Sequence, residues 1–235
     1  RSALLEDWHR QLPEDAPNHF LINIAPEKVE TVGDFLEAHG MSFEALYPMV
    51  RGRLVRINGE PVRQAVSKHD EIGALNRDLN LTWMAELPSD NRLQRGQWWD
   101  DTGGEGVSVE AELFEEMGLS MGDELTFRIG GQQVTAPVRS VRSVQWESMR
   151  PNFFMVFAPG KLDNLSATWL TSFHLEEGRK DLLNELGRQF PAVSILEVDH
   201  FIERIRSIIA QVTRAMEALL SMILVSALLV MAAVV

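Results

Sequence analysis

The last part of the chain, from Asp199 to Val235, constrains the fold more than any other stretch. Its first half is amphipathic, because apolar residues recur at alternating steps of three and four between charged and amide residues. This spacing is typical of a helix that packs along a second helix. We therefore predict a stalk helix over residues 199–217. Its apolar seam, which would carry coupling to a partner helix, consists of Ile202, Ile205, Ile209, Val212, Met216 and Leu219.

The charge pattern changes after Glu217. Ala218 to Val235 is apolar apart from two serines, and an uncharged run of this length is a candidate transmembrane helix. A buried core helix is the alternative, although apolar runs in cores are usually shorter. We predict that residues 218–235 begin a transmembrane helix and that the chain is a segment of a longer membrane protein. An unbroken helix from Asp199 onward would be ~55 Å long.

The opposite end of the chain offers a partner for this stalk. Leu5, Trp8 and Leu12 fall on one face of a helix, with the charged residues away from it. We predict an N-terminal stalk helix over residues 1–16, with an ordinary amphipathic helix as the alternative. The simplest arrangement is a domain held between two membrane helices, with the two stalks side by side at its base.

The sequence between the stalks contains two strand–helix–strand units. A proline suits the start of the first helix, Gly40 suits its left-handed end, and Asn58-Gly59 is a strong hairpin signal. The two units are similar in layout, and we expect one sheet backed by two helices, as in ferredoxin-like folds. The predicted strands are 19–24, 47–57, 169–175 and 193–198, and the predicted helices are 26–40 and 179–189.

The middle of the chain is richer in glycine than the flanking strand–helix–strand units. Val107–Val109 reads as a strand, Ala111–Met117 as a short helix, and the alternating residues around Gly130-Gly131 as a hairpin. We predict an α+β fold with a mainly β insertion. The predicted divisions are an N-terminal stalk (1–16), the first part of the α+β subdomain (17–87), the insertion (88–162), its second part (163–198), the C-terminal stalk (199–217) and the start of a transmembrane helix (218–235).

Composition and motifs argue against several kinds of chemistry. The net charge of −12 disfavours nucleic acid and peripheral docking on an anionic leaflet. The absence of cysteine excludes disulfides, thiol catalysis and thiolate metal sites. The 6 histidines form no metal-ligand pair, and neither a P-loop nor a nucleophile elbow is present. We therefore expect no enzymatic activity, no metal and no cofactor in this segment.

Two features remain as candidate contacts with a partner or substrate. Trp98 and Trp99 are adjacent, and in a strand they could not both face the same side. We expect either core packing or, for one or both, exposure to a ligand, lipid or partner. Arg51 and Arg53 share one face of a predicted strand, which is a contact surface or merely a solvated face.

The middle section also carries a family resemblance. Its strand, short helix and hairpin, with Gly118-Leu119, Gly122-Asp123 and Leu125-Thr126-Phe127, resemble the extracytoplasmic domain of FtsX/MacB-type ABC transporter permeases. Four further stretches are similar to the YbbP-like branch of that family, so that the resemblance covers essentially the whole chain. They are PNHFLINI from Pro17, LYPMVRGRLVRING from Leu46, LNLTW from Leu79 and SMRPNFFMVFAPG from Ser148.

The resemblance implies an architecture and a mechanism. The two strand–helix–strand units would be the family's porter part, and the insertion would be its sabre part. The segment would lie in the periplasm, as part of a protein of the bacterial inner membrane. Its partners would be a separate ATP-binding subunit, membrane lipid, a soluble periplasmic protein and a hydrophobic or amphiphilic substrate. Mechanotransmission along the stalks would couple ATP hydrolysis to extrusion or extraction of that substrate.

Two rival classes share some of these features. An extracytoplasmic ligand-sensing domain of a membrane receptor also has paired stalks, and a membrane-tethered enzyme would also be anchored this way. The enzyme requires a converging set of polar residues that the sequence does not show. Additional membrane helices in the full gene would indicate a permease, whereas a cytoplasmic signalling domain would indicate a sensor.

Overall fold

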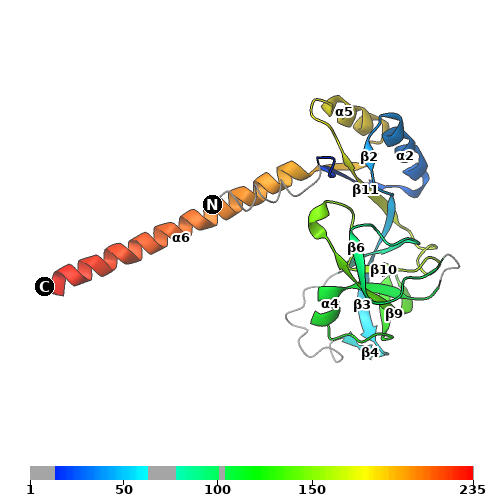
Figure 1. Ribbon diagram of the computed structural model, residues 1–235, viewed down its shortest axis with the longest axis horizontal. Coiled ribbons are helices and arrows are strands. Elements are labelled where there is room, and N and C mark those ends of the chain that lie inside the picture. Colours follow the sequence, from blue (N-terminus) through cyan, green and yellow to red (C-terminus); the bar gives the residue numbers. More distant parts are fainter. Residues whose placement is uncertain (1–13, 63–77, 101–103, 235) are drawn as a thin grey trace. The chain divides into compact units, whose positions relative to one another are not determined.

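The computed structural model describes residues 14–62, 78–100 and 104–234 (Figure 1). The N-terminal stalk predicted over residues 1–16 lies almost entirely outside these residues. The chain divides into two compact units, Arg1–Leu196 and Glu197–Val235, which are described separately. The α+β fold class is confirmed, with few helices and an extensive sheet.

The first part of the larger unit is a sheet with strand order β12-β1-β11-β3. Its strands begin and end close to the residues predicted from the sequence. A short strand, β2 (Ser42–Phe43), pairs with β11 at its edge. The elements are β1 (His19–Ile24), η1 (Pro26–Lys28), α2 (Val29–Ala38), β3 (Tyr47–Ile57), β11 (Thr168–His174), α5 (Lys180–Gln189) and β12 (Ser194–Glu197).

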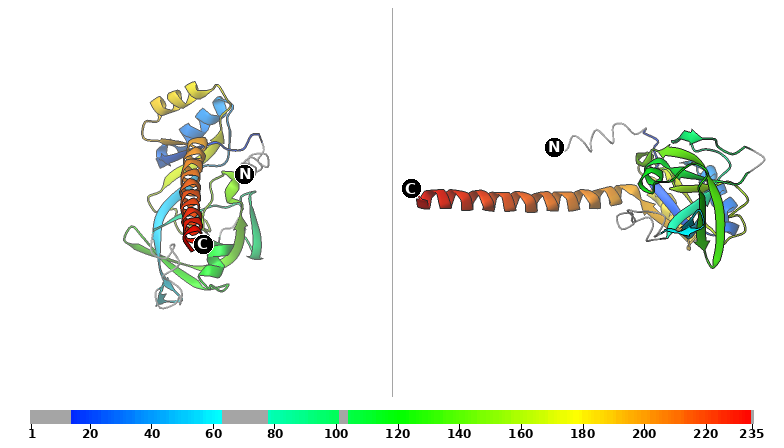
Figure 2. Two further views of the ribbon diagram at one scale, coloured as in Figure 1. Left: turned by 90° about the vertical axis from the view of Figure 1, so that its left-hand side faces the viewer. Right: turned by 90° about the horizontal axis from the view of Figure 1, so that it is seen from below.

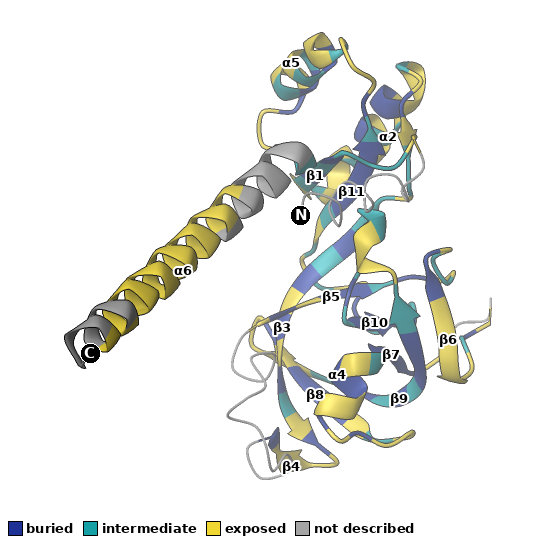
Figure 3. Ribbon diagram, turned by 60° about the vertical axis from the view of Figure 1, so that its left-hand side comes forward, coloured by how far each residue is buried: buried dark blue, intermediate teal, exposed yellow. Residues whose placement is uncertain are grey.

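Helices α2 and α5 share one apolar core with the sheet (Figure 3). Val32 and Leu36 of α2 and Leu186 of α5 are fully buried, as the helical spacing of apolar residues predicts. The ring of Phe35 meets that of Phe190 edge to face at 6.1 Å. Gly40 ends α2 with φ +65°, and the neighbouring Met41 amide donates to Leu36 O, so the predicted left-handed end is confirmed.

The second part is a closed barrel. Six strands pair in a ring, β3-β5-β10-β7-β9-β8, and β8 returns to β3. Alternate side chains fill the interior, among them Leu81, Leu125, Phe127 and Met155, all with 0% exposure. The other elements are β4 (Glu60–Pro61), β5 (Leu79–Trp83), β6 (Asn91–Gly96), β7 (Val107–Glu110), α4 (Ala111–Glu116), β8 (Glu124–Ile129), β9 (Gln132–Val144), η3 (Trp146–Ser148) and β10 (Met155–Phe157).

Strand β3 belongs to both the sheet and the barrel. Its first residues pair with β11, Val50 to Gly52 pair with β5, and Arg53 to Ile57 pair with β8. The predicted boundary between the α+β subdomain and the β insertion lies at residue 88. Strands β3 and β5 come before that residue, and both nevertheless form part of the barrel. The predicted domain boundaries stay predictions, but the β-rich part is not built from residues 88–162 alone.

Two hairpins form where the sequence predicts them. Asn58 and Gly59 have φ of 51° and 80°, and they join β3 to β4 with Ile57 opposite Glu60. Gly130 and Gly131 have φ of 56° and 94° and join β8 to β9 in the same way. Positive φ at both central residues is the type I′ geometry of two-residue hairpins, so both predicted hairpins are confirmed.

The smaller unit consists of one long helix, α6 (Val198–Val234, 37 residues), shown unbroken in Figure 2. Its described side chains are exposed along its length, including large apolar ones such as Leu220 (64%) and Met222 (70%). Over the described residues, no helix contains a window long and apolar enough to cross a membrane. The transmembrane helix predicted from Ala218 is therefore not confirmed and stays a prediction.

Replacing Gly52 with alanine should destabilise the barrel, because a Cβ there would lie 2.7 Å from Ile129 Cγ1 and Leu81 Cδ1. Overpacking of this kind costs about 1–3 kcal/mol. Gly33 in α2 is the matched control, because its nearest contact would be Leu46 Cδ1 at 3.7 Å and alanine stabilises a helix interior by about 0.5–1 kcal/mol. The urea midpoint should fall for Gly52→Ala and hold or rise for Gly33→Ala. An unchanged midpoint for Gly52→Ala would contradict this packing.

Candidate functional site

The sheet face opposite α2 and α5 is where the sheet meets the outside of the barrel. Side chains alternate along β1, so that Leu21 faces the helices and Ile22 faces this junction. Leu170 of β11 and Val156 of β10 extend the same apolar face across both parts. A separate small core forms here, and it is covered by the residues that follow β5 and β6.

Trp98 and Trp99 provide much of that cover. They follow β6 in irregular backbone, so their rings are not forced onto opposite faces and lie 3.9 Å apart between centroids. The Trp99 indole N–H donates to Met84 O at 2.7 Å, and the Trp98 indole N–H donates to Ala85 O at 2.7 Å. Trp99 is only 4% exposed. Of the two alternatives, core packing therefore holds for Trp99, while Trp98 is half-buried and its contact with a partner or substrate stays a prediction.

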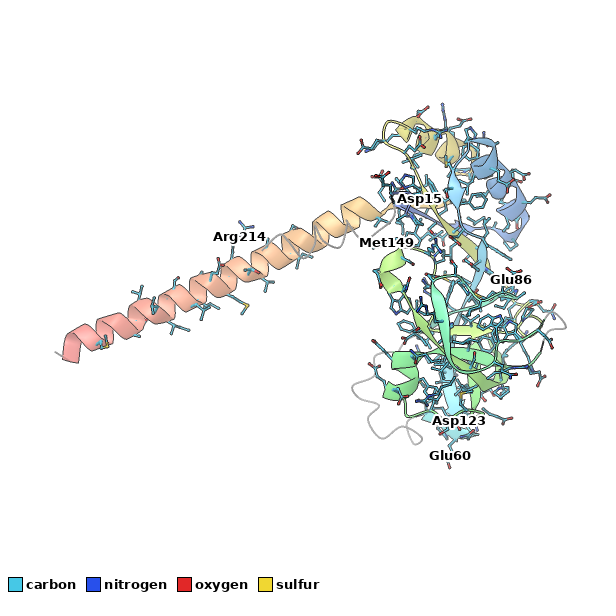
Figure 4. The ribbon with its side chains drawn as sticks, in the orientation of Figure 1. Asp15, Glu60, Glu86, Asp123, Met149 and Arg214 are labelled. Carbon is cyan, nitrogen blue, oxygen red and sulfur yellow. The ribbon has the colours of Figure 1, made fainter. Side chains whose placement is uncertain are left out.

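A buried polar cluster, which the sequence analysis did not single out, lies beside this face. The Asp90 carboxylate accepts hydrogen bonds from Ser148 Oγ at 2.7 Å, Asn152 Nδ2 at 2.6 Å and Asn91 Nδ2 at 3.0 Å. These bonds hold the loop after η3, which contains Met149 (labelled in Figure 4). Met149 adopts φ 58° there. Asp90 is only 7% exposed, so these hydrogen bonds replace the ones that its carboxylate would otherwise make with water. Such a cluster fixes loop geometry.

Arg142 is a second buried charge in this region, with 0% exposure. Burial lowers the pKa of its guanidinium to about 10, and the nearby carboxylates of Glu110 and Asp90 oppose the shift. The guanidinium donates to Phe153 O. Glu110 itself caps α4, accepting the amides of Glu112 and Leu113 at 3.1 and 2.9 Å. At neutral pH Arg142 therefore stays charged, and its hydrogen bond to Phe153 holds the segment before β10 against β9.

Within the described residues, no group of acidic and histidine side chains could hold a metal ion. Tyr47 is half-buried at the junction, and burial, followed by nearby Glu44, raises its pKa to about 12. The phenol is therefore neutral at physiological pH and is not poised as a base. In the part of the chain that the structure describes, these features form a packed junction.

Arg51 and Arg53 share the outer face of β3 and are both exposed, as the strand pattern predicts. They nevertheless have different surroundings. Arg53 Nε lies 3.1 Å from Asp78 Oδ1 in an exposed ion pair. Arg51 lines a pocket of about 580 Å³ between β3, the β8–β9 turn and the segment before β11. The two arginines therefore differ in their surroundings, Arg51 lines this pocket, and a role for either in contacts stays a prediction.

The predicted seam can be followed for three of its positions. Val212, Met216 and Leu219 lie on α6 and are 54%, 58% and 61% exposed in this chain. The side chains of Ile202, Ile205 and Ile209 lie outside the described residues, as does the N-terminal helix predicted to contact them. The described half of the seam is thus an apolar surface open to a partner, and its role in coupling stays a prediction.

Comparison with known proteins shows what the chain is similar to. The chain is 41% identical, over 205 residues and 87% of its length, to an Escherichia coli (strain K12) protein described as an uncharacterized ABC transporter permease, YbbP. The chain is therefore similar, over most of its length, to part of an ABC transporter permease. The resemblance to the YbbP-like permeases noted in the sequence is thereby confirmed. The chain spans 24% of the length of that permease. No family model and no solved structure matches the chain.

The two tryptophans allow a test of which one is structural. Trp99→Phe should lower the free energy of unfolding by about 1–3 kcal/mol, because it leaves the carbonyl of Met84 without its donor in a buried place. Trp98→Phe is the matched control, and its cost should stay below about 1 kcal/mol because water can reach the carbonyl of Ala85. Urea unfolding of both variants measures the difference. Equal losses would mean that both indoles are equally desolvated.

Proposed function

We propose that this chain forms an extracytoplasmic domain of an ABC transporter permease subunit, at the outer face of the bacterial inner membrane. The observation that carries the proposal is the 41% identity to a permease over most of the chain. The apolar run in α6 supports a connection to the membrane. The domain has no catalytic role in this proposal, and ATP hydrolysis belongs to a separate ATP-binding subunit.

The porter and sabre parts of the family can be proposed on the fold. The order β12-β1-β11-β3, with α2 and α5 on one face, is the order of a ferredoxin-like sheet and supports its assignment as the porter part. The barrel takes the place of the sabre part. It shares β3 with the sheet and includes β5, so the two parts are bound through continuous backbone and are expected to move together.

The proposed mechanism is mechanotransmission through α6. The helix begins at Val198, directly after β12 ends at Glu197, so no loop separates the helix from the sheet along the chain. A continuous helix transmits a displacement that a flexible linker would absorb. The exposed apolar side chains of α6 would contact a partner helix along the seam and membrane lipid beyond it. The work done outside the membrane would be extrusion or extraction of a hydrophobic or amphiphilic substrate, with a soluble periplasmic partner as recipient.

A charge in the seam should uncouple transport from ATP hydrolysis. Val212→Asp would place an unpaired carboxylate against the partner helix, which costs about 3–5 kcal/mol if the charge cannot reach water. In the full-length permease with its ATP-binding subunit, reconstituted into liposomes, this variant should release a fluorescent amphiphile about tenfold more slowly. ATP hydrolysis should continue.

Gln211→Asp is the matched control, because it adds the same charge one residue away and off the seam. Its transport and ATPase rates should stay close to those of the unmodified permease, since exposed substitutions usually change stability by less than about 0.5 kcal/mol. Membrane expression of both variants is checked first. If Val212→Asp transports as fast as Gln211→Asp, α6 is only a tether and coupling through this seam is wrong.

A further inference from the structure

The pocket beside Arg51 has an apolar part and a polar rim. Met49 and Leu165 are half-buried and form the accessible apolar part of the lining, behind which Val50 and Ile129 lie in the barrel core at 3% and 5% exposure. Around them stand exposed amide and hydroxyl side chains and one guanidinium. These polar lining residues are Asn23, Arg51, Gln132, Asn164, Ser166 and Thr168. A volume of about 580 Å³ lies in the range of small-molecule and peptide sites.

The charge of this lining is opposite to that of the whole protein. The chain carries 34 acidic residues and a net charge of −12, yet none of the described lining residues has a carboxylate. The nearby Asp163 does not line the pocket, and its carboxylate accepts the amide of Gly160 at 2.9 Å. Within the described residues, Arg51 forms no ion pair, unlike Arg53 two residues along the strand. Among the described residues, the pocket therefore offers one positive charge without a paired carboxylate, which suits a single anionic group.

The neutral rim groups also lack partners among the described residues. The side chains of Gln132, Asn164, Ser166 and Thr168 make no hydrogen bond there. Asn23 is held in place, because its Nδ2 donates to Ser194 Oγ at 3.1 Å while its backbone adopts φ 61° at an irregularity of β1. Backbone conformations of this kind cluster at binding sites. A ligand with amide groups close to its carboxylate would satisfy these donors and acceptors.

We propose that this pocket binds the carboxyl-terminal end of a peptide whose last residue is apolar. Arg51 pairs with the terminal carboxylate, the amide and hydroxyl side chains of the rim form hydrogen bonds with the last peptide groups, and the half-buried side chains of Met49 and Leu165 contact the last side chain. A simple fatty carboxylate fits less well, because its hydrocarbon chain would displace water from the polar rim and return no hydrogen bonds. The site does not depend on the transport role proposed above.

Calorimetry with two peptides tests the assignment without any substitution. The 235-residue chain, in a non-ionic detergent, is titrated with N-acetyl-Ala-Ala-Leu and with the same peptide as its carboxyl-terminal amide. The acid should bind with one-to-one stoichiometry, and the amide should bind at least about tenfold more weakly because it lacks the charge for Arg51. Equal binding of acid and amide, or no binding of the acid, overturns the proposal.

Arg51→Gln and Arg53→Gln form a matched pair on the same strand face. The first should weaken binding of the acid by about tenfold, and the second should change it by less than about twofold. Equal weakening in both variants would mean that the peptide senses only the general charge of β3, and this overturns the site. Octanoate is the competing probe. If octanoate binds as tightly as the peptide acid, the pocket is a fatty-carboxylate site and the peptide assignment is wrong.

Discussion

The pairing of β3 with two different sets of strands is the constraint on which the larger unit depends. Within 11 residues, β3 leaves the sheet beside β11 and closes the barrel between β5 and β8. Gly52 lies at the change of partners, where Ile129 and Leu81 leave no room for a Cβ. The barrel therefore cannot close without the strand that also completes the sheet, and neither part has an independent set of backbone hydrogen bonds.

Local stereochemistry explains why much of this fold was predictable. Asn58-Gly59, Gly130-Gly131 and Gly40 mark turns and a helix end because few residues other than glycine and asparagine adopt positive φ. The alternation in β3 likewise predicted its length and its buried face. Strand β6 was missed because Asn91–Gly96 is polar and mostly exposed, so that no apolar alternation marks it. Its place is fixed by pairing with β9, which is distant in the sequence.

The candidate site was less predictable than the fold, because its properties depend on contacts between distant segments. Trp98 and Trp99 are equivalent in the sequence, but only Trp99 is buried over the junction. Arg51 and Arg53 are equivalent on their strand, and Asp78 distinguishes them by pairing with Arg53 alone. The buried Arg142 lies in β9 between Val141 and Ser143, and nothing in these neighbours indicates that its guanidinium is buried against the distant Phe153.

Side-chain contacts reinforce the shared strand at several points across the junction. Glu44, just before β3, lies 3.2 Å from Arg150 of the loop after η3, in a pair about one-third exposed on each side. Trp83 of β5 meets Trp169 of β11 edge to face at 6.2 Å. A surface ion pair contributes at most about 1 kcal/mol, so the aromatic contacts and the continuous β3 backbone dominate the resistance to bending. The sheet and the barrel should therefore respond to a force as one body, and any coupling to α6 would displace the whole larger unit instead of opening a hinge within it.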